Sequence, residues 1–129
     1  MAKYPTKEKI MAVEQKFKPE VLKAVKYWKK EWWKPTKNDK SIYFLLTRLS
    51  QLYNKPLCIT NLPTDSHYNH LTQTINLHNT SVITALHEFA HHLFGSSELK
   101  ACRWSVWLFK KTFPKSFSKL KWKGHMLIK

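Results

Sequence analysis

Apolar residues recur every three or four positions through much of the first 53 residues, which is the spacing of one helical face. The clearest stripe begins after Pro19 and stops before Pro35, and lysines fill the opposite face. A second stripe covers residues 42–53, and a weaker helical pattern covers residues 6–17. The pattern therefore predicts a helical N-terminal half.

The spacing of apolar residues changes between residues 54 and 81. Residues 57–60 form a short run of apolar, β-compatible side chains, and residues 72–78 alternate polar with apolar side chains, as a half-buried strand does. A chain of 129 residues suits one domain. We expect a single α+β domain with a short antiparallel sheet, in which the helix over residues 42–53 packs against the helix that follows the sheet.

Two further helical patterns follow the predicted strands. The first covers residues 82–94, with capping side chains on offer in the three residues before it and a stop at Gly95. The second opens at Ser96 or Ser97 and closes before Pro114. The two helices are therefore expected to be neighbours joined by a short turn.

The first of these helices carries His87, Glu88 and His91 in the pattern H-E-x-x-H. Both imidazoles project from one helix face and can reach one metal ion, while Glu88 lies beside the open coordination position. This arrangement is typical of a hydrolytic zinc site. The alternative is a buried histidine pair satisfied by hydrogen bonds, which would leave Glu88 as an unpaired charge in the core.

A third ligand is expected, because catalytic zinc sites usually have three from the protein. Glu98 is the nearest carboxylate, and on the second helix it shares a face with Ala101, Cys102 and Ser105. These small side chains would let the two helices approach closely. A first-turn glutamate is also favoured by the helix dipole alone, and the two interpretations are compatible.

The two helices together resemble zincin metallopeptidases of the gluzincin type. In that family the third ligand comes from a downstream glutamate helix, often E-x-x-A-x-x-aromatic, which residues 98–104 match. The likeness is nearest to the minigluzincins and the ImmA/IrrE-like peptidase domain, and it covers roughly residues 57–112. Six residues separate His91 from Glu98, fewer than is usual in the family. The whole stretch 91–98 also resembles the metzincin continuation H-x-x-G-x-x-H, with one extra residue and with Glu in place of the last His.

The resemblance implies a zincin-like fold and a zinc-dependent metallopeptidase acting on a peptide or protein. It implies His87, His91 and Glu98 as zinc ligands, and Glu88 as the general base that takes a proton from the attacking water. It also implies that the strand over residues 72–78 forms the rim of the cleft and offers a free edge to an extended substrate.

The net charge of +15 is concentrated at the two ends of the chain. Residues 1–40 carry twelve lysines and five acids, residues 110–129 carry seven lysines and no acid, and residues 41–109 are nearly neutral. We expect a basic helical N-terminal part (1–40), a catalytic core (57–112) and a basic tail (113–129). Aromatic residues among the terminal lysines suit single-stranded nucleic acid or an acidic protein surface. The alternative is a solvated lysine face over a buried aromatic stripe.

Composition excludes several classes of protein. Cys58 and Cys102 are too few for a disulfide framework and suit a reducing cytosol, and Cys102 is expected in the core rather than as a ligand. The chain has only two glycines, too few for the glycine-rich loops that bind phosphate groups. There is no apolar run near the roughly 18 residues of a membrane span and no signal-peptide pattern. We expect a cytoplasmic protein with no membrane partner, and the sequence does not indicate its oligomeric state.

The basic tail is too apolar for a free end, because Trp122, Met126, Leu127 and Ile128 interrupt its lysines. We expect it to dock. One place is the cleft, with the tail in the position of a substrate strand and His125 near the metal, which would give a self-inhibited, latent peptidase. The other place is the core.

The remaining histidines leave rival functions open. A structural zinc site closed by His78 or His125 would suit a nucleic-acid-binding or DNA-associated protein. A protease acting on DNA-bound proteins would instead combine the catalytic site with the basic ends. Tyr68, His70 and His78 are candidates for polarising the scissile carbonyl. Taken singly, the spare histidines are expected at the surface: His67, His70, His78 and His92.

Overall fold

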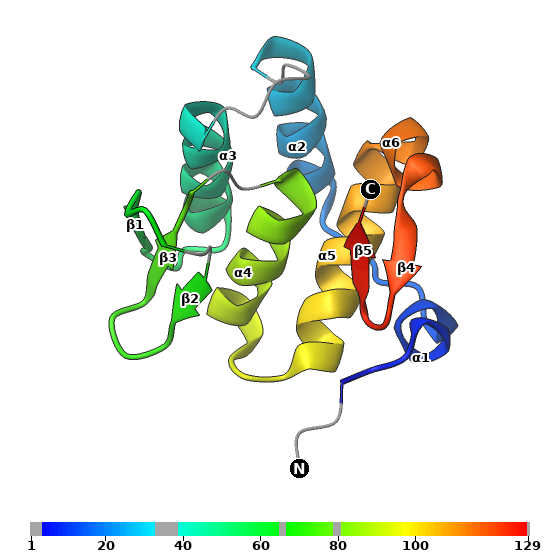
Figure 1. The fold of residues 1–129 in the computed structure, drawn as a ribbon. Helices are drawn as coiled ribbons and strands as arrows, with labels where there is room; N and C mark the ends of the chain where they lie inside the picture. The colour runs from blue at the N-terminus through cyan, green and yellow to red at the C-terminus, as the bar shows by residue number, and fades with distance from the viewer. Residues whose placement is uncertain (1–3, 33–38, 65–66, 79–80, 129) are drawn as a thin grey trace.

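The computed structural model describes residues 4–32, 39–64, 67–78 and 81–128 (Figure 1). Its elements, in chain order, are α1 (Lys7–Ala12), α2 (Pro19–Glu31), α3 (Asp39–Leu52), β1 (Cys58–Thr60), β2 (His67–Asn69), β3 (Thr74–Asn76), α4 (Val82–Phe94), α5 (Glu98–Thr112), α6 (Pro114–Lys119), β4 (Lys121–Lys123) and β5 (Met126–Ile128). Helices combined with two small sheets confirm the predicted α+β class.

Helices α2 to α5 form the body of the molecule, with α4 between α3 and α5 (Figure 1). Their apolar stripes meet in one core, in which Leu46, Leu86 and Phe89 are fully buried. Each such side chain contributes about 1.5–3 kcal/mol by leaving water. The contact between α3 and α4 confirms the predicted packing of the third helix. None of the helices in the described ranges is both long enough and apolar enough to span a membrane.

The three-stranded sheet has the order β1-β3-β2, with β1 parallel and β2 antiparallel to β3. The prediction of an antiparallel sheet was therefore only half right. Residues 61–73 form the connection that parallel strands require, and β2 lies inside this connection. The free edge predicted for residues 72–78 was wrong, because β3 is the central strand and pairs on both sides. The edge strand beside α4 is β2.

The tail completes the protein rather than replacing a substrate strand. Phe113 is 1% exposed in the main core. Leu127 packs with Ile10, Cys102 and Val106 in a smaller core between α1, α5 and β5. Strands β4 and β5 pair with each other as a hairpin, so the predicted position in a substrate strand's place was wrong and docking against the core is confirmed.

Candidate metal centre

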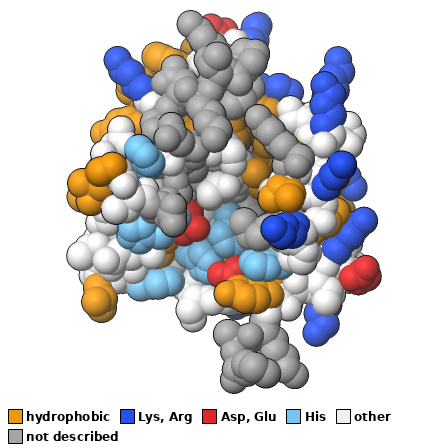
Figure 2. All heavy atoms as spheres, viewed as in Figure 1, with side chains coloured by type: hydrophobic (Ala, Val, Ile, Leu, Met, Phe, Trp, Pro, Cys, Tyr) orange, Lys and Arg blue, Asp and Glu red, His pale blue; other side chains and the backbone are white. Residues whose placement is uncertain are grey.

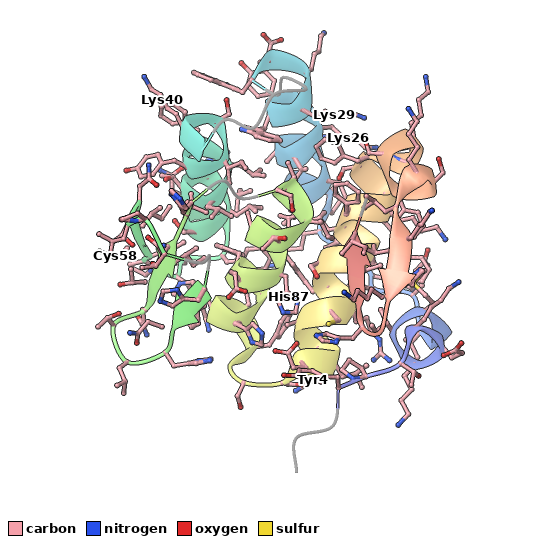
Figure 3. All side chains as sticks on the ribbon, viewed as in Figure 1. Tyr4, Lys26, Lys29, Lys40, Cys58 and His87 are labelled. Carbon is pink, nitrogen blue, oxygen red and sulfur yellow. The ribbon has the colours of Figure 1, made fainter. Side chains whose placement is uncertain are left out.

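Helix α4 places His87 and His91 on one face. Ser81 caps the helix by accepting from the Thr84 backbone N–H at 3.3 Å, and the chain stays helical to Phe94. The rings of the two histidines lie 4.8 Å apart between centroids, and both residues are less than 9% exposed. Figure 3 shows His87 between α4 and α5.

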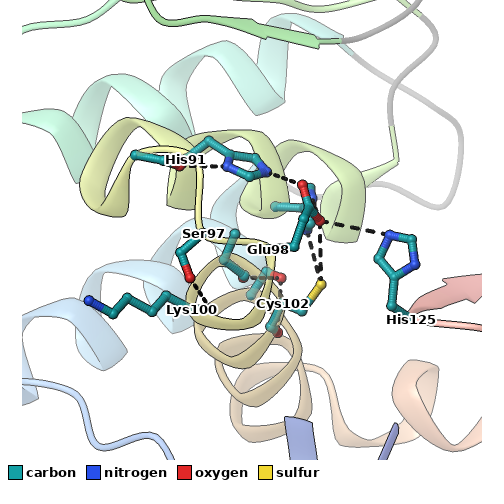
Figure 4. Close-up of polar contacts among 10 residues, drawn as sticks. His91, Ser97, Glu98, Lys100, Cys102 and His125 are labelled. Carbon is teal, nitrogen blue, oxygen red and sulfur yellow. Dashed lines mark hydrogen bonds and ion pairs between the residues drawn. The ribbon is translucent and has the colours of Figure 1, made fainter. Parts of the chain in front are cut away.

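A sharp turn brings Glu98 back to these histidines. Gly95 adopts a positive φ of 74°, which favours glycine, and Ser97 caps α5. Glu98 Oε1 lies 2.8 Å from His91 Nε2, and Glu98 Oε2 lies 3.3 Å from His87 Nε2 (Figure 4). The predicted ligand set His87, His91 and Glu98 is therefore brought together. The fully buried Ala101 lets α5 approach α4, as the small residues of this face predicted.

Hydrogen bonds orient the outer nitrogen of each ring. Nδ1 of His91 lies 2.7 Å from the carbonyl oxygen of Gly95, and a carbonyl only accepts, so Nδ1 carries the hydrogen. Nδ1 of His87 lies 3.8 Å from Sγ of Cys102. In the neutral ring, Nε2 of His91 then presents a lone pair to a carboxylate, and Nε2 of His87 does the same in the tautomer whose Nδ1–H faces the sulfur. A lone pair and an anion 2.8 Å apart require a cation between them, either a proton or a metal ion.

The spacing fits a metal ion. Two ligands of one zinc ion at about 2.0–2.1 Å and the tetrahedral angle lie about 3.3–3.5 Å apart. The contact of Glu98 with His87 at 3.3 Å matches that distance, and its contacts with His91 at 2.8 Å and with His125 at 3.7 Å lie on either side of it. Imidazole and carboxylate are ligands that zinc accepts. The residues present therefore fit a zinc ion.

Cys102 belongs to the same cluster. His87, Glu98 and Cys102 offer ligand atoms within 4.8 Å of one another and could together hold a metal ion. Its thiol donates to Glu98 Oε2 at 3.9 Å and approaches the Nδ1 side of His87, while the nitrogen facing Glu98 is Nε2. Burial and the nearby Glu98 raise the pKa of Cys102 to about 12, so it is a neutral thiol without a metal. We favour Cys102 as the group that orients His87.

Burial also controls the charges around the centre. It lowers the pKa of His87 to about 4, outweighing the attraction of Glu98, so this imidazole is neutral at pH 7 and its lone pair is free for a metal. Burial raises the pKa of Glu88, although His91, His67 and a hydrogen bond from the Tyr68 backbone oppose the shift. Glu88 therefore lies near the histidines and is tied to edge strand β2.

The other histidines and Tyr68, the remaining candidates for roles at the site, differ in their exposure and contacts. His67, His70 and His78 are exposed, as expected, but His92 is buried at 7% and this expectation was wrong. The Tyr68 hydroxyl is bonded to His92 at 2.9 Å, so it is engaged within the protein rather than aimed at a substrate carbonyl. His70 packs edge-on against Tyr68, with ring centroids 4.8 Å apart.

The centre reaches the surface, because the side chain of Glu98 is 28% exposed. Figure 2 shows histidine side chains gathered around acidic ones on one face, with lysine and arginine side chains along the border of that face. A scan against models of protein families, a search of curated proteins and a search of solved structures each found no significant match. The site is therefore interpreted from its own geometry.

Proposed function

We propose that this protein is a zinc-dependent metallopeptidase in which His87, His91 and Glu98 hold the metal and Glu88 is the general base. The observation that supports it most is the meeting of two Nε2 atoms at one carboxylate, with both Nδ1 atoms already engaged.

In the proposed reaction, a side chain of the protein would carry out the proton transfer. Bound zinc would polarise the peptide carbonyl and make water more acidic. Glu88 would take the proton on a carboxylate oxygen and later hand it to the leaving amine. The Tyr68 backbone N–H holds this carboxylate at the edge of the sheet. An extended peptide laid along edge strand β2 would therefore pass the general base.

The experiment compares wild type with Glu88→Gln, each loaded with one zinc per chain, on an unstructured polypeptide such as casein. Both are also made in a His125→Ala background, because His125 lies 3.7 Å from Glu98. We expect Glu88→Gln to keep the zinc and lose hydrolysis, since this residue is a base and not a ligand. Loss of zinc from Glu88→Gln, or no hydrolysis by zinc-loaded protein in either background, would overturn the proposal.

A second candidate is a nucleic-acid-binding module with a structural zinc, favoured by the position of His125 beside Glu98. The terminal aromatics give it limited support, because Trp28 and Phe113 are buried, and Lys29 covers the Phe113 ring at 4.9 Å. Tyr27 and Trp32 stay exposed at 65% and 45%. Binding of single-stranded DNA that weakens steeply with salt, without any hydrolysis, would favour this candidate.

A further inference from the structure

His125 lies at the tip of the C-terminal hairpin, beside the ligand triad. Its Nε2 is 3.7 Å from Glu98 Oε2, the same oxygen that His87 Nε2 approaches at 3.3 Å (Figure 4). Gly124 and His125 form a two-residue turn between Lys123 and Met126, and Gly124 has the positive φ, 63°, that such a turn takes at its first position. The turn therefore presents His125 directly to the carboxylate.

The ring of His125 is held from its other side. Tyr4 stacks on it, with centroids 4.2 Å apart and planes 5° from parallel. Tyr4 precedes α1, and α1 is fixed to α5 because Arg103 donates to the Lys9 carbonyl at 2.7 Å and Trp107 to the Ile10 carbonyl at 3.2 Å. Both ends of the chain thus hold His125 in place.

We propose that His125 is a fourth protein ligand of the metal bound by His87, His91 and Glu98, so that the resting protein has a closed site. This inference rests on the proposed metal function. A catalytic zinc site keeps one position open for water or substrate, whereas four protein ligands close it. Hydrolysis would therefore require His125 to leave.

The hairpin is suited to leaving. The other three ligands lie on α4 and α5, the helices that share the most extensive packing in the molecule. Strands β4 and β5 have three residues each, and a lone two-stranded hairpin is only marginally stable. Lys121, Lys123 and Ile128 are exposed, and among the described hairpin residues Leu127 is buried and Trp122 partly buried against the small core of Ile10 and Val106. The fourth ligand thus lies on a short element that is held by few buried contacts and by the Tyr4 stack.

The test uses Zn²⁺ and Co²⁺ as probes of the full chain, in wild type, His125→Ala and His125→Cys, with His78→Ala as the histidine control. Co²⁺ in the wild type should show the intense visible absorption of a four-coordinate ion. His125→Ala should shift this spectrum, because water replaces an imidazole, and should lower zinc affinity by at least about tenfold. His125→Cys should restore binding and add a thiolate-to-cobalt band that His125→Ala, with the same Cys102, lacks. His78→Ala should match wild type.

The outcomes separate this inference from the proposed function. An unchanged cobalt spectrum and unchanged zinc affinity in His125→Ala overturn the fourth ligand and leave the peptidase standing. The expected spectral changes without casein hydrolysis in any variant support the fourth ligand and overturn the peptidase. A wild type that binds neither ion overturns both. Circular dichroism of the metal-free variants checks that each has folded. If His125→Ala does not fold, the thiolate-to-cobalt band of His125→Cys still decides whether position 125 binds the metal.

Discussion

The hydroxyl of Tyr68 donates a hydrogen bond to Nδ1 of His92 across 2.9 Å, joining edge strand β2 to the helix of the metal centre. The direction follows from the other side of the ring, where Nε2 lies 3.2 Å from the Lys55 carbonyl oxygen and must carry the hydrogen. The same strand donates its Tyr68 backbone N–H to Glu88. The position of Glu88, the proposed general base, therefore depends in part on this strand.

Tyr68→Phe should lower the free energy of unfolding by about 0.5–1.5 kcal/mol, because one hydrogen bond is lost and Nδ1 of His92 is left without this donor. It should also reduce hydrolysis while keeping zinc affinity, since the ligands are untouched. Tyr53→Phe is the matched control, because it removes a hydroxyl bonded to Trp104 in the core, away from Glu88. Urea unfolding and casein assays compare the two. Equal hydrolysis by both variants would contradict the link to Glu88.

Glu98→Ala should weaken zinc binding by more than the roughly 10- to 100-fold that is typical of losing a residue hydrogen-bonded to a metal ligand. The reason is that the Glu98 carboxylate itself contacts three imidazoles. Competition with a chelator measures the affinity. Glu14→Ala is the control, since Glu14 pairs with Lys111 at the surface instead. If the affinity of Glu98→Ala is that of wild type, the third ligand is a histidine and Glu98 only a first-turn acid.

Cys102→Ala should reduce zinc affinity by no more than about 10- to 100-fold, because the thiol orients His87 and does not bind the metal. The wild-type protein loaded with Co²⁺ should accordingly lack a thiolate-to-cobalt absorption band. A band in the wild type that disappears in Cys102→Ala would instead make Cys102 a ligand, as its distances to His87 and Glu98 also permit.

Gly95→Ala should destabilise the protein by about 1–3 kcal/mol through backbone strain, because φ is 74° and ψ is −142° at this residue. Clash with more distant residues adds nothing, since a Cβ here would meet no atom beyond its chain neighbours within 4 Å. Gly95→Asn should not rescue stability, because asparagine favours the left-handed helical region, where ψ is positive. Thermal unfolding measures the stability of both variants against wild type. Full stability of Gly95→Asn would show that the turn has another conformation.

Much of the helical part of the centre could be predicted, because its signals are local. Ser81, Gly95 and Ser97 cap helices whose apolar period is visible along the chain, and Gly95 with Ser97 fixes the turn between His91 and Glu98. The candidate metal ligands follow from the H-E-x-x-H spacing and one nearby carboxylate. The identity of the metal and the activity remain predictions.

The sheet and its contacts could not be predicted in the same way. Strand β2 contains one apolar residue, Tyr68, between His67 and Asn69, so no alternation marks it as a strand. Its pairing with β3 buries Ile75, and this tertiary contact, not the local sequence, makes it extended. His92 was misassigned for a related reason: its partners, Tyr68 and Lys55, come from distant parts of the chain.

The short turn at Gly95 has a consequence for folding. Three of the four groups around the candidate metal position lie within residues 87–98, so their contacts need only a helical hairpin and a small loop-closure entropy. Contacts of such low sequence separation form early, whereas His125 must wait for the C-terminal hairpin to dock. An ion present during synthesis could therefore be held by the triad before the last histidine arrives, and metal capture would precede closure of the site.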